Sequence, residues 1–184
     1  IFHLVVHGNP GGGKSTFCFQ FANYLAENHG KTIYISGEEG FSPTLKKKAE
    51  ETQSDSSNLF FANFKTATEI KEHIENIYPF IVIDSLNNMG IDADGLRDLR
   101  EHFPNSTFIT ICQSTKDGKM RGSQEIVHDA DIVVSVVKPI AKTSKNGRIK
   151  SYTPAFCHCN IIVPMSIGIP PPDQSYLNMF RKFV

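Results

Sequence analysis

The sequence predicts an α/β protein built on a mostly parallel, twisted sheet with helices on both faces. Short apolar runs rich in β-branched residues alternate with longer amphipathic stretches, which is the pattern of repeated strand-helix-strand units. The 184 residues, 40% of them hydrophobic, are enough for one buried core and too few for two ordinary domains. Nineteen basic and nineteen acidic residues cancel, so the overall charge does not favour a polyanionic partner.

Six apolar runs are the predicted strands, and they cover residues 1–7, 31–36, 58–62, 80–84, 106–112 and 131–137. Three stretches between the strands have apolar residues at helical spacing. These predicted helices contain Phe17, Phe21, Tyr24 and Leu25, then Ile70, Ile74 and Ile77, and then Leu96, Leu99, Arg100 and Phe103.

The last third of the sequence has a different composition. Residues 138–150 are basic and polar, and residues 163–172 contain four prolines. The predicted core therefore occupies residues 1–150, with its last strand ending near residue 137 and a hairpin or extended strands after it. Residues 151–184 are predicted to be a C-terminal extension of unknown structure and not a separate domain.

Composition also indicates where the protein acts. The four cysteines are few for the length, and two of them lie in apolar runs where buried free thiols are common, which fits a reducing, cytoplasmic setting. The Cys157-His158-Cys159 cluster lacks a second ligand pair, so we do not expect a metal site there. No apolar run approaches the roughly 18 to 20 residues that span a bilayer, and we expect no membrane partner. Because the chain opens in an apolar run without Met, we expect a core cut from a longer protein.

A glycine-rich motif joins the first predicted strand to the first predicted helix. The pattern GxxxxGK[ST] is matched in full by Gly8, Asn9, Pro10, Gly11, Gly12, Gly13, Lys14 and Ser15, and Thr16 follows as a neighbour that completes the predicted cofactor-binding set. The glycines let backbone N–H groups converge on phosphate oxygens, and the helix directs its positive dipole end to the same place. The alternative is a glycine-rich turn without chemical consequence, but strand, loop, Lys and hydroxyl are all in register.

The motif predicts ATP and Mg²⁺ as cofactors. Lys14 is expected to reach the β and γ phosphates, and Ser15 to offer its hydroxyl to Mg²⁺. Thr16 is expected to cap the helix or to touch the α phosphate.

Three further strands deliver polar side chains to the carboxyl edge of the sheet, where open α/β sheets bind ligands. Asp84 is expected to hold Mg²⁺ through water, and its alternative role is a helix cap. Glu38 is predicted to polarise the attacking water, although a solvated acidic turn that includes Glu39 has the same composition. Gln113 is predicted to sense the γ phosphate.

The segment after Gln113 is basic, carries hydroxyls and has glycine hinges. It lies in the locally basic stretch 116–150, which holds eight Lys or Arg and four Asp or Glu. Such a loop suits phosphate backbones and order-disorder switching, and the alternative is an ordinary exposed loop. The predicted DNA-contacting residues are Lys116, Lys119 and Arg121.

Together these residues resemble the RecA and RadA/Sms recombination ATPases. Four segments carry the resemblance: GNPGGGKST, YISGEEG, IVIDSL and TKDGKMRGSQEIVHDADIVVSVV. The bacterial RadA/Sms branch is the most similar, because it also places a TKDG loop, a glycine and a helix ending in a His and an Asp before the next strand. The resemblance covers residues 1 to about 150 and implies a RecA-like P-loop NTPase core.

The resemblance implies an ATPase that assembles into rings or filaments on single-stranded DNA, with the nucleotide at subunit interfaces. By position, Glu38 is similar to the catalytic glutamate, Asp84 to the magnesium-side aspartate and Gln113 to the γ-phosphate sensor. Lys145 and Arg148 are similar to basic residues of the family's KNRFG element that act across the interface, although this sequence reads KNGRI there.

Some features differ from RadA. The 184 residues contain neither the four-cysteine zinc module nor the protease-like domain of RadA proteins, and residues 151–184 resemble no family. Gln113 is more similar to RecA and to replicative helicases of the DnaB type.

The leading hypothesis is Mg²⁺-dependent ATP binding and hydrolysis coupled to single-stranded DNA binding, in DNA recombination or repair. One alternative is the motor core of a DnaB-type replicative helicase, which strand displacement on a forked duplex distinguishes. The other is a KaiC-like regulatory ATP-binding module that does not bind nucleic acid.

Overall fold

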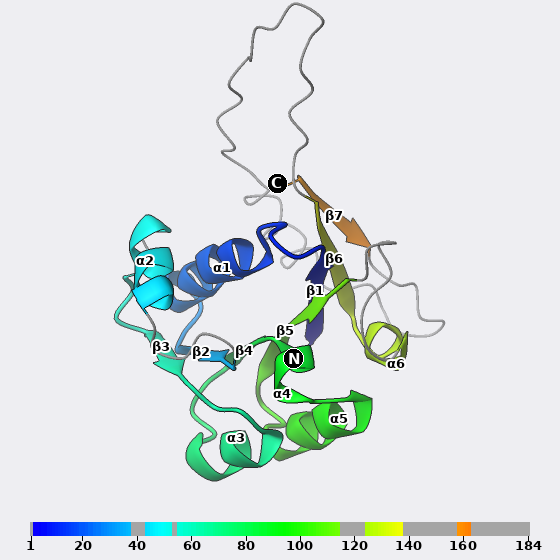
Figure 1. Ribbon diagram of the computed structural model, residues 1–184. Coiled ribbons are helices and arrows are strands. Elements are labelled where there is room, and N and C mark those ends of the chain that lie inside the picture. The colour runs from blue at the N-terminus through cyan, green and yellow to red at the C-terminus, as the bar shows by residue number, and fades with distance from the viewer. Residues whose placement is uncertain (1, 38–42, 53–54, 115–123, 138–157, 163–184) are drawn as a thin grey trace, which may run out of the picture.

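A seven-stranded sheet runs through the centre of the computed structural model, in the strand order β3-β2-β4-β5-β1-β6-β7 (Figure 1). The structure describes residues 2–37, 43–52, 55–114, 124–137 and 158–162. The strands are β1 (His3–Gly8), β2 (Thr32–Ser36), β3 (Leu59–Ala62), β4 (Phe80–Asp84), β5 (Thr107–Gln113), β6 (Ile132–Val137) and β7 (His158–Ile162). All neighbouring strands from β3 to β6 pair in parallel, and β7 is antiparallel to β6. The predicted mostly parallel sheet is confirmed.

The six predicted strands are confirmed to within two residues at each end. Their near-continuous apolar sequences reflect burial on both faces, because a parallel sheet is covered by its crossover helices. Leu4, Val5 and Val6 of β1 are fully buried, and so are Ile81, Val82 and Ile83 of β4. The apolar runs could therefore be recognised as strands without knowledge of their order.

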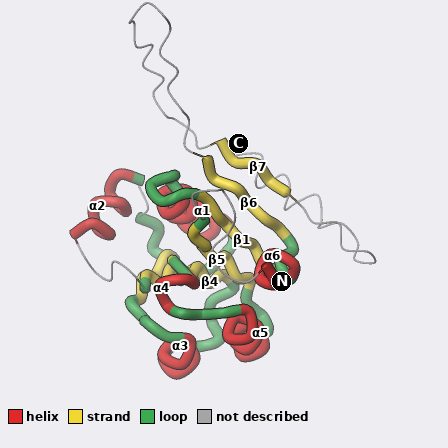
Figure 2. Tube along the Cα trace, turned by 45° about the vertical axis from the view of Figure 1, so that its right-hand side comes forward, coloured by secondary structure: helices red, strands yellow, loops and turns green. Residues whose placement is uncertain are grey.

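Helices cover both faces of the sheet (Figures 1 and 2). They are α1 (Lys14–Asn28), α2 (Pro43–Glu51), α3 (Ala67–His73), α4 (Leu86–Met89), α5 (Ala93–His102) and α6 (Gln124–His128). One apolar cluster joins α1 and Leu45 of α2 to one face. A second cluster joins α3, α4, α5 and α6 to the other face. The phosphate-loop helix α1 therefore packs on the face of the sheet opposite to α3, α4, α5 and α6.

The end of α3 differs from the predicted helix. The spacing of Ile70, Ile74 and Ile77 predicts one helix through all three residues, but α3 ends at His73. Ile74 is extended, with φ −100° and ψ 125°, and its N–H still bonds to the carbonyl of Ile70. Its side chain remains buried while Ile77 is 48% exposed, so the apolar periodicity continues past the helix into the connection to β4.

Aromatic packing fixes the position of α1 on its face. The ring of Phe19 lies 4.3 Å from that of Tyr34 in β2 and 5.6 Å from that of Phe61 in β3. Phe19 and Tyr34 are fully buried. Because Tyr34 also reaches a predicted site residue, this packing matters for the site described below.

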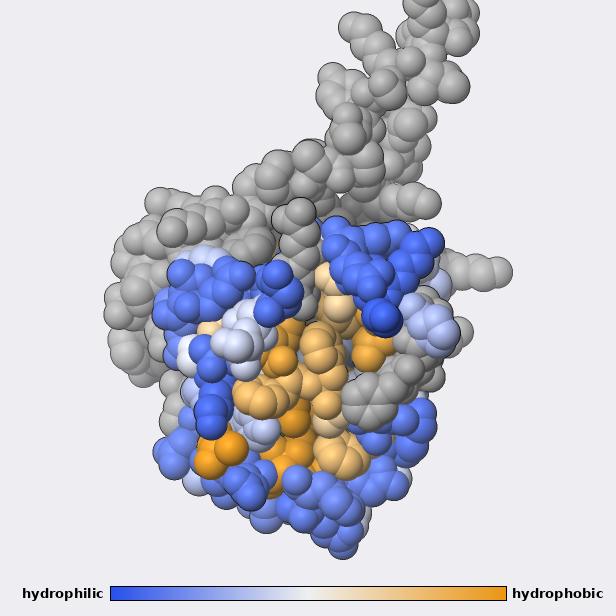
Figure 3. All heavy atoms as spheres, turned by 90° about the vertical axis from the view of Figure 1, so that its left-hand side faces the viewer, coloured by the Kyte–Doolittle hydropathy of each residue, from blue (hydrophilic) through white to orange (hydrophobic). Residues whose placement is uncertain are grey.

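Apolar surface gathers at the β3 edge of the sheet (Figure 3). Phe60 is 37% and Ile77 is 48% exposed, and a groove of about 330 Å³ lies nearby. The groove is lined by Ile33, Ala62, Phe64, His73, Ile74, Glu75, Ile77 and Tyr78. None of the predicted site residues is among them.

The chain beyond residue 137 is described only at β7. This strand pairs with β6 over residues 133–137 and is one extended strand of the kind expected there. The predicted division at residue 150 falls outside the described residues and stays a prediction. Within the described part of the chain, no helix has the length and apolar character needed to cross a membrane.

Candidate nucleotide-binding site

The phosphate loop lies between the central strand β1 and the first turn of α1, as predicted (Figure 1). Gly8 ends β1, and the N–H of Gly12 donates to the carbonyl of Asn9 at 3.0 Å to close the turn. Gly13 is the N-cap of α1 in the left-handed region, with φ 95°. The first turn of α1 carries no acidic residue, so the positive end of the helix dipole is available to an anion.

Two glycines of this loop are required by the backbone around them. A Cβ at Gly8 would lie 2.3 Å from the carbonyl oxygen of Val136 in β6, and a Cβ at Gly12 would lie 2.9 Å from that of Asn9. Gly11 and Gly13 have φ of 70° and 95°, which side chains rarely adopt. The glycines therefore fix the shape of the loop as well as leave room for a ligand.

Lys14 is buried and directed back over the loop. Its Nζ donates to the carbonyl oxygens of Gly8 and Asn9, each at 3.0 Å. The side chain is only 8% exposed, so its charge lies in a partly desolvated place where an anion is bound more strongly than in water. On the same turn, Ser15 is half-buried and Thr16 is exposed. The structure thus brings the predicted cation and hydroxyls together at one helix end.

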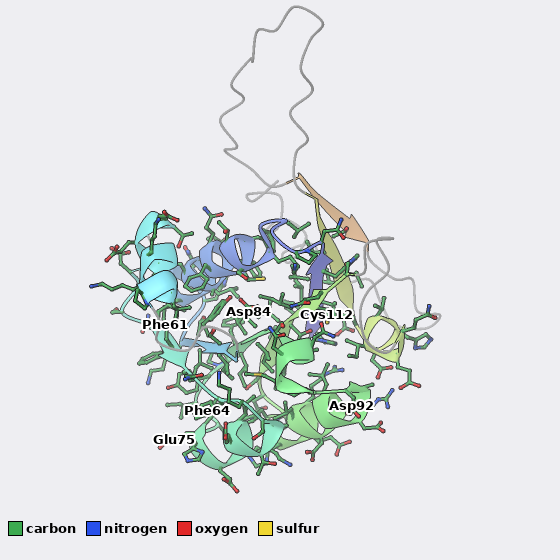
Figure 4. The ribbon with its side chains drawn as sticks, in the orientation of Figure 1. Phe61, Phe64, Glu75, Asp84, Asp92 and Cys112 are labelled. Carbon is green, nitrogen blue, oxygen red and sulfur yellow. The ribbon has the colours of Figure 1, made fainter. Side chains whose placement is uncertain are left out.

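Asp84 is held at the end of β4 by a buried tyrosine. The phenol of Tyr34 donates to Asp84 Oδ2 at 2.6 Å. Tyr34 packs against Phe19 of α1, so the Asp84 carboxylate lies on the face of the sheet that α1 covers (Figure 4). Sequence reasoning missed Tyr34, because its contact with Asp84 depends on the pairing of β2 with β4, in which Ser36 is opposite Asp84.

A carboxylate and a hydroxyl on one face of the sheet fit Mg²⁺, which prefers oxygen ligands and often keeps several waters. Asp84 is half-buried and keeps one carboxylate oxygen that Tyr34 does not bind. The donor set of Ser15 and Asp84 therefore suits the ion that the phosphate loop predicts.

Gln113 ends β5 directly beside the phosphate loop, because it is opposite Gly8 in the parallel register of β1 and β5. Its backbone N–H donates to Asn87 Oδ1 of α4 at 2.8 Å. The next residue, Ser114, donates its N–H to the carbonyl of Gly8 at 3.0 Å. The Gly8 carbonyl therefore accepts from both Lys14 and Ser114, and it connects the phosphate loop to the end of β5.

His7 strengthens the same connection. Its Nδ1 lies 3.2 Å from Ser114 Oγ. Burial, and then the nearby positive charge of Lys14, lower the pKa of His7 below the usual value of 6.5. Sequence reasoning placed Ser114 at the start of the predicted DNA-contacting loop, residues 114–122, and missed its contact with Gly8. It also missed His7 and Asn87, because their contacts join chain segments that are distant in sequence.

The cysteine beside Gln113 is not a nucleophile. Burial raises the pKa of Cys112 to about 12, so its thiol stays protonated near neutral pH. Cys112 and Cys18 are both buried free thiols, as the apolar runs around them predict.

Several predicted site residues lie outside the described residues, and their roles stay predictions. They are Glu38, Lys116, Lys119, Arg121, Lys145 and Arg148. The structure does describe the residues next to two of these segments. Gly37 precedes Glu38, and Ser114 begins the connection that holds the predicted DNA-contacting residues.

A glycine loop with a buried Lys between a central parallel strand and a helix, together with an Asp at the end of a neighbouring strand, defines a P-loop protein with a RecA-like core. No family model matches the chain. It is 33% identical over 148 residues to DNA repair protein RadA of Streptococcus pyogenes serotype M1 and 30% identical over 146 residues to that of Listeria monocytogenes. The chain has a RecA-like fold, and over 71% of its length its sequence is similar to that of the RadA proteins.

Each RadA match covers 71% of this chain and 32% of the relative, so the chain spans about a third of the length of these relatives. Among solved structures, the flagellar accessory protein FlaH from Methanocaldococcus jannaschii has a TM-score of 0.58. It is 14% identical in sequence, and the match covers 73% of this chain and 70% of that chain. This similarity supports the RecA-like fold.

Proposed function

We propose that the chain binds and hydrolyses ATP with Mg²⁺, and that this activity is coupled to single-stranded DNA in recombination or repair. The observation that carries the proposal is the buried Lys14 directed back over a complete phosphate loop, in a chain similar to RadA. The buried thiols of Cys18 and Cys112 fit a reducing, cytoplasmic location, which is part of the proposal.

The residues of the loop have distinct tasks in binding. Lys14 exchanges the carbonyls of Gly8 and Asn9 for oxygens of the β and γ phosphates, and the loop N–H groups bind phosphate oxygens. Ser15 and Asp84 would hold Mg²⁺, with Asp84 acting through water, and the ion would supply positive charge against the phosphates.

Coupled hydrolysis requires one residue that orients the attacking water and another that detects whether the γ phosphate is still present. Glu38 polarises the attacking water, since it follows β2 at the carboxyl edge of the sheet. Gln113 contacts the γ phosphate, and the hydrogen bonds from Ser114 and Lys14 to the Gly8 carbonyl give the loop and the end of β5 a shared atom. Loss of the γ phosphate then alters the segment that follows Ser114.

The same segment binds DNA through Lys116, Lys119 and Arg121, whose charges suit phosphate backbones. Lys145 and Arg148 act on the nucleotide of a neighbouring subunit in a ring or filament. An isolated subunit is therefore expected to bind ATP and to turn it over slowly.

Nucleotide binding and turnover test the ATPase proposal. We expect Lys14→Ala to lower ATP affinity and to reduce turnover by about 100-fold or more, and Glu38→Gln to keep ATP binding while losing hydrolysis by a similar factor. Lys71→Ala is the matched control, because Lys71 is paired with Asp98 of α5 and is not part of the phosphate loop. Binding is measured with a fluorescent nucleotide and turnover by phosphate release. Unchanged ATP binding and turnover in Lys14→Ala would exclude the proposal.

A separate measurement tests the DNA half. Saturating single-stranded DNA should raise the turnover of the wild-type protein. Changing Lys119 and Arg121 together to Ala should weaken DNA binding. The slope of the logarithm of the binding constant against the logarithm of the salt concentration should become shallower by about 1.4, because each lost phosphate contact removes about 0.7. If DNA changes neither turnover nor oligomer size, the DNA half is wrong and the ATPase half stands.

A further inference from the structure

The end of β5 extends beyond its neighbour β4. The two strands pair in parallel as far as Asp84, which is opposite Ile111, and β5 then continues through Cys112 to Gln113. The backbone of Gln113 is partly buried at this point. Its N–H therefore needs an acceptor that β4 does not provide, because an unpaired buried polar group costs free energy.

The Gln113 N–H is directed toward the β4 side of β5. Along a parallel strand, successive N–H groups alternate between the two neighbouring strands. The N–H of Thr107 donates to the carbonyl of Pro79, directly before β4, at 2.8 Å, and the N–H of Ser114 donates to the carbonyl of Gly8 in β1 at 3.0 Å. The odd-numbered residues of β5 therefore face β4, and Gln113 is the last of them.

An asparagine side chain takes the place of the missing strand. If β4 continued at the same register, the carbonyl of Ser85 would accept from Gln113. That carbonyl instead accepts from the N–H groups of Asn88 and Met89, at 3.1 and 3.2 Å, where the chain turns into α4. Asn87 Oδ1 accepts from the Gln113 N–H at 2.8 Å. One carboxamide therefore continues the β4 side of the ladder beyond the end of the strand.

Helix α4 gives Asn87 a fixed position beside β5 (Figure 1). Leu86 and Met89 are buried in the apolar cluster on this face of the sheet. The helix ends at Gly90, whose φ is 63°, and the N–H of Ile91 then donates to the carbonyl of Leu86 at 3.0 Å. The acceptor for Gln113 therefore comes from a packed turn of helix with both ends anchored.

Gln113 is consequently held from two sides. Asn87 binds its N–H from α4, and the N–H of the next residue, Ser114, bonds to the Gly8 carbonyl that Lys14 also contacts. We propose that Asn87 is a positioning residue for Gln113, and that it holds the γ-phosphate sensor in register beside the phosphate loop. The inference rests on the proposed function, since it assigns a further residue to the same reaction.

The first test removes the Asn87 acceptor and separates turnover from nucleotide binding. In Asn87→Ala we expect kcat to fall by about 10-fold or more, because a small misplacement of a catalytic group lowers the rate strongly. Affinity for ADP, which has no γ phosphate, should stay within about 2-fold of the wild-type value. Asn28→Ala is the matched control, because Asn28 Nδ2 donates to a backbone carbonyl at 2.8 Å, at the end of α1 far from the phosphate loop. It should leave kcat and ADP affinity unchanged.

Amide hydrogen exchange reports the contact itself. The Gln113 N–H should exchange about 10-fold or more faster in Asn87→Ala than in the wild type. The N–H of Ile111, which lies within the paired part of β4 and β5, should exchange at the wild-type rate. Asn87→Asp keeps an acceptor oxygen of the same reach, so it should keep the Gln113 N–H protected.

A double variant distinguishes positioning from an independent effect. In the Gln113→Ala background, Asn87→Ala should cause little further loss of kcat, because both changes act through one side chain. Unchanged kcat in Asn87→Ala overturns the inference, as do equally faster exchange at Ile111 and Gln113, or multiplicative losses in the double variant. A wild-type protein without Lys14-dependent turnover is a different result, because it refutes the proposed function and the inference falls with it.

Discussion

The hydroxyl of Tyr34 decides how the Asp84 carboxylate is presented. One oxygen of Asp84, Oδ2, accepts the phenolic hydrogen bond at 2.6 Å. The ring of Tyr34 is fully buried against Phe19 and Phe61, so the hydroxyl has little freedom to move. The carboxylate is therefore oriented before any ligand arrives.

Tyr34→Phe should weaken the response to Mg²⁺. The substitution keeps the buried ring and removes the hydroxyl that donates to Asp84. We expect the Mg²⁺ concentration for half-maximal ATPase activity to rise by about 3- to 10-fold. This change corresponds to part of the free energy that a hydrogen bond to a charged group contributes. The measurement is turnover against Mg²⁺ at saturating ATP.

Tyr78→Phe is the matched control, because Tyr78 packs with the cluster on the opposite face of the sheet. It should leave the Mg²⁺ dependence as it is. If Tyr34→Phe and Tyr78→Phe have the same Mg²⁺ dependence, the orienting role of Tyr34 is wrong.

At the scale of residues, the sequence predicts those that belong to a local motif. Lys14 and Ser15 begin α1 and Asp84 ends β4, and their proposed roles follow from those local motifs. Tyr34 and Asn87 carry no such signal, because a buried Tyr and a helical Asn are common in any core. Their roles depend on pairs of strands and helices that the sequence does not specify.

At the scale of elements, β1, the phosphate loop and α1 form one unit that β6 constrains from the side. The carbonyl of Val136 in β6 approaches the Cα of Gly8 so closely that no Cβ fits between them. The loop is therefore shaped by a strand more than a hundred residues away in the sequence.

Gly8→Ala should destabilise the protein and the loop together. The new Cβ would lie 2.3 Å from a backbone oxygen, so β1 or β6 must shift. We expect the free energy of unfolding to fall by about 2 to 3 kcal/mol, as for an overpacked core, and ATP affinity to fall because Gly8 supports Lys14. Urea denaturation and nucleotide titration measure the two effects.

Gly90→Ala provides the comparison. Gly90 has a φ of 63°, but a Cβ there would meet nothing within 4 Å. Gly90→Ala should lower the free energy of unfolding by about 1 kcal/mol, because of backbone strain alone, and should leave ATP affinity unchanged. If Gly8→Ala and Gly90→Ala lower the free energy of unfolding equally, the contact with β6 does not constrain the loop.

The elements also show where sequence periodicity fails. The strands are predicted well because burial on both faces makes each one an uninterrupted apolar run. The end of α3 is predicted wrongly because Ile74 is buried from an extended backbone. Apolar spacing reports burial, and it does not report whether the backbone that achieves burial is still helical.

At the scale of the whole molecule, a buried histidine makes the fold sensitive to acid. His3 is fully buried in β1, with its Nε2 2.9 Å from Thr110 Oγ1 of β5. Burial, and then the positive charge of Arg100, lower the pKa of His3 to about 4. Protonation of His3 thus opposes the packing of the central strands.

Stability should fall between pH 6.5 and pH 4. In this window the unfolded chain, with an ordinary His pKa of 6.5, binds a proton that the folded chain does not. The contribution of His3 is complete above pH 6.5 and is lost as the pH falls, by about 2 kcal/mol at pH 5. Urea unfolding at pH 7.5 and pH 5 measures it.

His3→Gln removes the titrating group while keeping a side chain that can bond to Thr110. Its unfolding free energy should change less between the two pH values than that of the wild type. An identical pH dependence in the two proteins would assign acid sensitivity to other groups.

The sequence by itself determined the strand-loop-helix unit that matches the phosphate-loop pattern, the alternation of strands and helices, and the places of Lys14, Ser15 and Asp84 at the ends of their elements. These features are local, because each depends on residues adjacent in the chain or on burial of a single segment. Tertiary structure alone decided the strand order and register. Those place Gln113 beside Gly8, the Tyr34 hydroxyl on Asp84 and the Asn87 carboxamide on Gln113. The physical reason is that hydrophobic burial is non-directional, so equally apolar strands do not specify their neighbours until the whole sheet is assembled.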